Sequence, residues 1–168
     1  MNKTRIHAAA QSGFTLVELI VVMVILGVLA ATALPKFVTV GDDAEIAAHA
    51  ATGGAFTSAV SLVKAQWMIN GSSGAEDNVA GFGNDDVDTN ANGWPADTSN
   101  DNTLNTADEC VRVWNGLMQN PPSVATATGS DYQATVSTNT CTYTYQASTG
   151  MTITYDSANG SVTVDKTP

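Results

Sequence analysis

Positive charge is the first thing that this sequence has little of. Its 168 residues include six Lys and Arg against sixteen Asp and Glu, which gives a formal net charge of −10. Nucleic acids and anionic lipid surfaces attract positive charge, so a surface this acidic disfavours nonspecific binding to either of them. We therefore predict no specific nucleic-acid binding.

Histidine is also scarce, and the common catalytic motifs are missing. The two histidines are His7, in a short polar leader, and His49, in an alanine-rich segment without a nearby nucleophile. The sequence contains no phosphate-binding loop, zinc-ligand spacing or nucleophile elbow. We therefore predict that the protein is not an enzyme, and we give His49 a surface or packing role.

Cysteine occurs at two positions, Cys110 and Cys141. In a cytosolic protein they would be interpreted as two buried thiols, whereas in an exported domain a disulfide is the better interpretation. Closing such a loop stabilises a fold by about 3–4 kcal/mol in the chain-entropy model. The choice depends on whether the chain is exported, and the N-terminal segment bears on that question.

Charge is nearly absent from a long apolar segment, residues 14–34, in which Glu18 is the single charged residue. These 21 residues would form about 31 Å of helix, which matches the roughly 30 Å hydrocarbon core of a bilayer. Lys3 and Arg5 precede the segment, so the positive-inside rule places residues 1–13 in the cytoplasm and the bulk of the chain outside. A secretory signal cleaved at the small residues near the end of the segment is the competing interpretation.

Glu18 needs a positively charged partner, because an ionisable side chain at membrane depth costs a few kcal/mol and is usually paired. The nearest lysine, Lys36, lies about 27 Å away along a helix. Cleavage after Gly13 would create a new α-amine on Phe14, four residues before Glu18 and on the same helix face. The residues alone leave open whether this amine comes from the same chain or from a neighbour.

The seven residues that start at Gly13, Gly-Phe-Thr-Leu-Val-Glu-Leu, resemble the processing motif of type IVa prepilins. The resemblance implies cleavage between Gly13 and Phe14 by a prepilin peptidase, and N-methylation of Phe14. It also implies that Glu18 neutralises the amine of an adjacent subunit during assembly. Gly27 and Pro35 stand where these pilins commonly carry a helix-weakening glycine and a proline, so we expect a helix break between them in a filament.

The helical pattern resumes after this segment. Phe56, Val60 and Val63 recur at helical spacing and predict one apolar face on an amphipathic half-helix over residues 36–70. Residues 71–105 are rich in Gly, Asn, Asp and Ser, and they are interpreted as a long surface loop.

Part of this loop matches the first half of a calcium-binding loop, with Asp88, Asn90 and Asn92 at alternate positions before a glycine. The bidentate glutamate that completes the pattern is missing, because Ser99 stands in its place. Half-patterns are common in turns rich in Asn and Asp, so we favour a solvated acidic loop. No cofactor is predicted, and calcium is kept as the alternative.

The rest of the chain predicts a short helix and a sheet. A capping box that starts at Thr106 opens a helix over 106–119, and four alternating segments within 131–166 predict a four-stranded antiparallel sheet. The expected fold class is α+β, and it resembles the type IV pilin fold, in which a long N-terminal helix packs on the sheet. A disulfide between Cys110 and Cys141 would join the short helix to the second strand.

The predicted organisation is a cleaved leader over 1–13, a transmembrane and filament-core helix over 14–35, the half-helix over 36–70 and a globular head over 71–168. The resemblance implies a structural pilin subunit that polymerises into a type IV pilus for surface adhesion, motility or biofilm formation. Its head would lie in the periplasm, anchored to the inner membrane, before the chain enters an extracellular filament.

The implied partners are other copies of the chain, the prepilin peptidase and N-methyltransferase, and an inner-membrane assembly platform with its ATPase. One alternative is a pseudopilin of a type II secretion system, which uses the same N-terminus. Another is a signal-anchored periplasmic protein that does not polymerise. Residues 92–95, Asn-Gly-Trp-Pro, and the segment 47–61 also resemble the mannose-sensitive haemagglutinin type of pilin.

Overall fold

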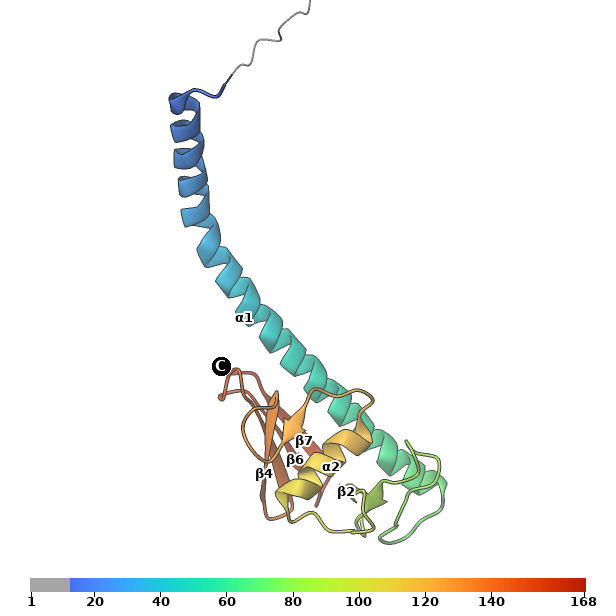
Figure 1. Ribbon diagram of the computed structural model, residues 1–168. Coiled ribbons are helices and arrows are strands. Elements are labelled where there is room, and N and C mark those ends of the chain that lie inside the picture. The colour runs from blue at the N-terminus through green and yellow to red at the C-terminus, as the bar shows by residue number, and fades with distance from the viewer. Residues whose placement is uncertain (1–12) are drawn as a thin grey trace, which may run out of the picture. The chain divides into compact units, whose positions relative to one another are not determined.

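The computed structural model describes residues 13–168, apart from the side chains of residues 34–39. Lys3 and Arg5, on which the predicted topology depends, therefore lie outside the described residues. The chain forms two compact units, Met1–Asp43 and Ala44–Pro168. Within the described residues there are one long helix, one short helix and seven strands (Figure 1).

Helix α1 (Leu16–Ile69) begins in the first unit and ends in the second. Gly71 follows its end with a φ of 76°, a left-handed conformation that glycine adopts without steric cost. The helix runs through Gly27 and Pro35 in this single chain. The predicted helix break between these two residues concerns a packed filament, and it stays a prediction.

The main sheet of the second unit has five strands in the order β3-β4-β5-β6-β7. Their bounds are β3 (Val124–Ala125), β4 (Tyr132–Ser137), β5 (Thr140–Tyr145), β6 (Thr152–Asp156) and β7 (Ser161–Asp165). Strands β4 to β7 form the predicted antiparallel meander, whereas β3 is an additional strand that pairs with β4 in parallel. Two residues are too few to show an alternating pattern, which is why β3 was not predicted. The α+β fold class is confirmed.

Within the second unit, helix α1 buries one face in the core that the sheet provides. Phe56, Val60 and Val63 on this face are completely buried, in agreement with their helical spacing. The Phe56 ring lies 5.5 Å from that of Trp114 and meets Tyr143 of β5 edge-on, also at 5.5 Å between centroids. Edge-on and offset contacts between aromatic rings add to the stabilisation from burial, so this cluster fixes α1 on the sheet.

Helix α2 (Ala107–Leu117) lies against the same core and begins with the predicted capping box. The Glu109 N–H donates to the Thr106 hydroxyl oxygen at 3.3 Å, and the Thr106 N–H donates to the Glu109 carboxylate at 2.8 Å. Cys110 of α2 and Cys141 of β5 form the predicted disulfide, with Cα atoms 5.7 Å apart. The bond joins α2 to the sheet.

The segment 71–105 is folded onto the second unit. It contains an antiparallel pair of short strands, β1 (Asp88–Thr89) and β2 (Pro95–Asp97). Its buried side chains are Val79, Val87, Asp88, Thr89, Pro95, Ala96, Asp97 and Leu104. The interpretation of the segment as a solvated surface loop was therefore wrong for these buried residues. Composition identifies residues that form turns, but it does not show which of them are buried.

Candidate functional site at the N-terminus

The carboxylate of Glu18 is held by the residue that caps helix α1. Its Oε2 accepts hydrogen bonds from the backbone N–H and from the hydroxyl of Thr15, both at 2.8 Å. The Glu18 N–H in turn donates to the Thr15 hydroxyl oxygen at 3.3 Å. Thr15 and Glu18 thus form a capping box, which satisfies donors that the start of a helix otherwise leaves unpaired.

This capping box is a feature that sequence reasoning missed, although its signal, a threonine followed three residues later by a glutamate, is present. The start of a helix offers N–H donors and the positive end of the helix dipole, both of which favour a negative charge. In the uncleaved chain, Glu18 is therefore a partner of its own helix start. Thr15 joins the predicted site as the residue that positions the carboxylate.

Beyond Glu18, the first part of α1 presents apolar side chains in all directions. The exposed fractions of its large hydrophobic side chains run from 49% at Val21 to 65% at Met23. The stretch Leu16–Ala33 is long and apolar enough to cross a membrane, and no part of it is buried by the described chain. A helix that is apolar on every side needs an apolar surrounding, which a bilayer or other copies of the chain can supply.

A second stretch of α1, Val40–Ile69, is also long and apolar enough to cross a membrane, and 33% of it is buried. It contains Phe56, Val60 and Val63, which pack into the core of the second unit. The core helix of a folded domain meets the same criterion. The first stretch is therefore the better candidate for a membrane anchor.

Gly13 and Phe14, between which cleavage is predicted, precede α1 and are both exposed. A Cβ atom on Gly13 would meet no atom within 4 Å, and the same holds for Gly27. Packing within the single chain therefore does not require glycine at either position. The need for glycine would then come from outside the chain's own packing. At Gly13 it would come from recognition by a processing enzyme, and at Gly27 from the need for a weakened helix.

The residues of the half calcium pattern serve the fold of their own segment. Asp88 accepts backbone N–H bonds on both carboxylate oxygens, from Asn78 at 2.8 Å and from Asn100 at 2.7 Å. The side-chain oxygen of Asn90 accepts the N–H groups of Asn92 at 2.9 Å and Trp94 at 3.1 Å. Within residues 13–168, no three His, Cys, Asp or Glu side chains come together to hold a metal ion. Calcium binding by Asp88, Asn90 and Asn92 stays the untested alternative to the prediction of no cofactor.

His49 has the packing role that was one of its two predicted roles. It is 1% exposed, and its Nδ1 lies 2.9 Å from the hydroxyl of Tyr132. The two rings stack with centroids 5.7 Å apart. Burial raises the pKa of Tyr132 to about 12, so its hydroxyl keeps its proton at neutral pH.

Comparison with known proteins bears on the N-terminal segment. Residues 9–34 match the family described as the prokaryotic N-terminal methylation motif. The chain is also similar to the type IV narrow pilus major component PilA5 of Thermus thermophilus, with 46% identity over 54 residues. That match covers 32% of this chain and 47% of the relative, so the chain spans about half the length of the curated relative it matches. No solved structure matches the chain.

The N-terminal methylation motif, the exposed apolar helix and the α+β fold with its disulfide thus occur together in this chain, a combination similar to that of type IV prepilins. The chain has the N-terminal segment and the fold of a type IV prepilin.

Proposed function

We propose that this protein is a structural subunit that polymerises into a type IV pilus, used for surface adhesion, motility or biofilm formation. One observation carries the proposal: within the matched residues 9–34, the apolar part of α1 exposes large apolar side chains on every side, and Glu18 is the single carboxylate there. A bilayer can cover such a helix before assembly. A bundle of identical helices can cover it afterwards.

The processing steps follow from the motif. A prepilin peptidase would cleave between Gly13 and Phe14 on the cytoplasmic side and N-methylate the new amine of Phe14. Before assembly, the chain would be anchored in the inner membrane with its head in the periplasm. An assembly platform driven by an ATPase would then move it into the extracellular filament.

Glu18 would pair with the Phe14 amine of a neighbouring copy in the filament. In the uncleaved chain its carboxylate accepts two hydrogen bonds from Thr15. These bonds hold the carboxylate at the helix start, one turn from the position where the new amine appears. An ionic contact in an apolar filament core has little competition from water, so a missing partner would be costly.

The substitution Glu18→Ala tests this role. We expect cleavage after Gly13 to proceed normally, while filaments sheared from the cells disappear or become rare in electron micrographs. Glu45→Ala is the matched control, because Glu45 is an exposed carboxylate on the same helix outside the apolar segment, and it should leave assembly unchanged. Normal filaments from Glu18→Ala would contradict the proposed pairing.

A pseudopilin of a type II secretion system is the second candidate, because the same N-terminus would serve a short periplasmic filament. The disulfide and the large folded segment between α1 and α2 favour a surface pilus. A deletion strain separates the two: loss of surface filaments with normal protein secretion supports the pilus, and the reverse supports the pseudopilin. Mass spectrometry of the mature protein tests both against a signal-anchored protein that does not polymerise, since only a processed prepilin begins with N-methyl-phenylalanine at position 14.

A further inference from the structure

Helix α1 has a face within the second unit that the core does not cover. Ala51, Ala55, Leu62 and Ile69 follow one another at i, i+4, i+11 and i+18, which places them along one side of the helix. Ala51 and Ala55 are exposed, and the exposed fractions of Leu62 and Ile69 are 60% and 76%. We call these four residues the outer face. Between Glu45 and Lys64, α1 carries no Asp, Glu, Lys or Arg.

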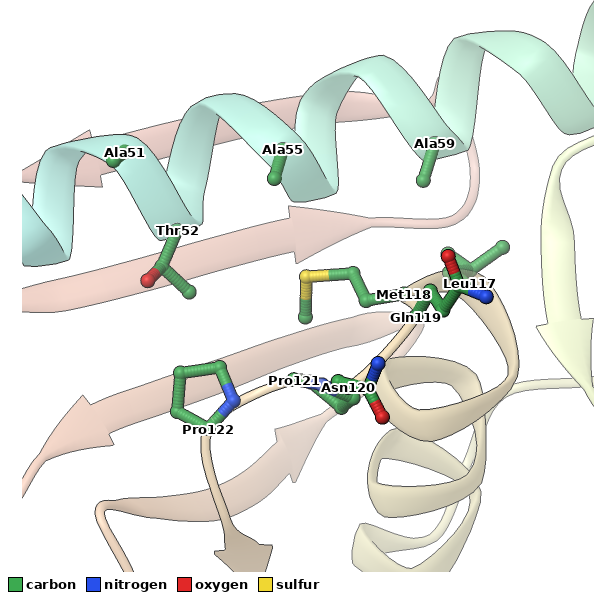
Figure 2. A pocket seen from close by; sticks show the side chains of 10 residues that line it. All are labelled: Ala51, Thr52, Ala55, Ala59, Leu117, Met118, Gln119, Asn120, Pro121 and Pro122. Atoms are coloured by element: carbon green, nitrogen blue, oxygen red, sulfur yellow. The ribbon is translucent and has the colours of Figure 1, made fainter.

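A groove borders the first part of the outer face. It has a volume of about 360 Å³ and lies between α1 and residues 117–122, which end α2 and follow it. Ala51, Thr52 and Ala55 form the wall on α1, and the Met118 side chain extends under them toward Pro122 (Figure 2). None of the described residues that line the groove is charged. The groove therefore suits an aliphatic side chain and offers no ionic partner.

The second part of the outer face, Leu62 and Ile69, is an exposed aliphatic patch. The large hydrophobic side chains that the described second unit exposes are Leu62, Met68 and Ile69, all in the last turns of α1. Leu62 lies about 16 Å along the helix from Ala51, on the same face. A patch and a groove on one face of a rigid helix cannot meet within one chain, but the patch of one copy can enter the groove of another.

We propose that, in the polymer, the groove of each copy receives Leu62 and Ile69 from a second copy. This inference rests on the proposed function, because it names head surfaces through which copies would meet. Charge favours a second copy as the occupant. The whole chain is strongly acidic, so two copies repel each other least where both surfaces are uncharged, as the groove and the patch are.

The arrangement also determines the kind of assembly. Groove and patch are different surfaces of the same chain, so each contact leaves one copy with a free groove and the other with a free patch. Such heterologous contacts give a ring if the rotation between copies closes and an open helical filament if it does not, and a pilus requires the second case. Two antiparallel copies would instead close into a dimer, but chains anchored in one membrane with the same topology keep their α1 helices parallel.

Disulfide crosslinking in assembled filaments tests the contact in the full-length protein. Both native cysteines are already paired with each other, so a new disulfide shows that two introduced cysteines of neighbouring copies lie close together. We expect oxidised filaments of Ala55→Cys combined with Leu62→Cys to give a ladder of covalent multimers on a non-reducing gel. Neither single variant should give a ladder. The matched control combines Ala55→Cys with Met68→Cys, because Met68 is 63% exposed but projects about 100° away from Ile69 around the helix.

The outcomes distinguish a failure of the proposed contact from a failure of the proposed function. Normal filaments without a ladder, a ladder that the control gives equally, or dimers alone would overturn the contact and leave the pilus proposal intact. Unmodified cells that never form filaments would overturn both. Should the cysteine variants fail to assemble, Leu62→Gln combined with Ile69→Gln should lower the filament yield about tenfold, while Met68→Gln leaves it unchanged. Equal yields from these variants would also overturn the contact.

Discussion

At the scale of single residues, three carboxylates, those of Glu18, Asp88 and Asp97, accept hydrogen bonds from donors on their own chain. Glu18 accepts from Thr15, and Asp88 accepts from backbone N–H groups. Asp97 has no exposed side-chain surface and forms an ion pair with Arg112, whose Nη2 lies 3.1 Å from its Oδ2. Burial alone would raise the pKa of Asp97, but the hydrogen bonds from Arg112 and Ser99 outweigh it, so this pKa lies below its usual value. The Asp97–Arg112 pair is not visible in the sequence, because the two residues are 15 positions apart.

Arg112→Gln should destabilise the protein at neutral pH, because it leaves the buried Asp97 carboxylate without its cation. We expect a loss of about 1–3 kcal/mol, less than for a fully buried pair because the Arg112 side chain is 37% exposed and partly screened by water. The folded-state pKa of Asp97 is lowered, so the pair contributes stability above the usual value of about 3.9 and loses it as the pH falls through the folded value. Urea unfolding of the full-length proteins in detergent should therefore give a lower free energy of unfolding for Arg112→Gln than for the unmodified protein at pH 7. This difference should become smaller in acid. Arg112→Lys, which keeps the positive charge, should lose less stability. A stability difference that does not change with pH would contradict the proposed role of the Asp97–Arg112 pair.

At the scale of elements, the sequence predicted those parts whose signal is local and repeated. The capping box of α2, the apolar face from Phe56 to Val63 and the four antiparallel strands are all present. Strand β3 and the pair β1–β2 were not predicted, because strands of two or three residues show no periodicity. The segment 71–105 was misjudged because contacts with residues outside the segment, such as that of the buried Asp97 with Arg112, are not visible in its composition. In the candidate site, the motif identified Gly13, Phe14 and Glu18, but the role of Thr15 emerged only from the hydrogen bonds.

Two neighbouring glycines of α1 provide a matched test of how closely this helix approaches the sheet. A Cβ on Gly53 would collide with the side chain of Val164 on β7, whereas a Cβ on Gly54 would meet no atom within 4 Å. Gly53→Ala should therefore destabilise the protein by about 1–3 kcal/mol through overpacking. Gly54→Ala should stabilise it by about 0.5–1 kcal/mol, because alanine is the better helix former. Urea unfolding of both variants measures the effects, and shifts of the same sign would contradict the close approach of Gly53 to β7.

At the scale of the whole molecule, apolar and charged residues are separated along the chain. After removal of residues 1–13, four Lys and Arg remain against sixteen Asp and Glu. Only Glu18 of these charges lies in the apolar segment at residues 14–34. Assembly through the apolar helices would therefore place the acidic residues on the outside of a filament. The negative charge that makes the heads of neighbouring copies repel each other would also make neighbouring filaments repel each other.

Salt should accordingly control whether purified filaments associate side by side. At about 0.01 M ionic strength the screening length is about 30 Å, and acidic filaments should repel one another and remain dispersed. At about 0.15 M the screening length falls to about 8 Å, so repulsion weakens and bundles should form. Light scattering and electron microscopy across a sodium chloride series measure the change, and it should reverse on dilution because no covalent contact is involved. A variant in which two exposed acidic residues, Asp77 and Asp108, become lysine should bundle at lower salt. Bundling that is independent of salt in both proteins would show that contacts other than charge govern the filament surface.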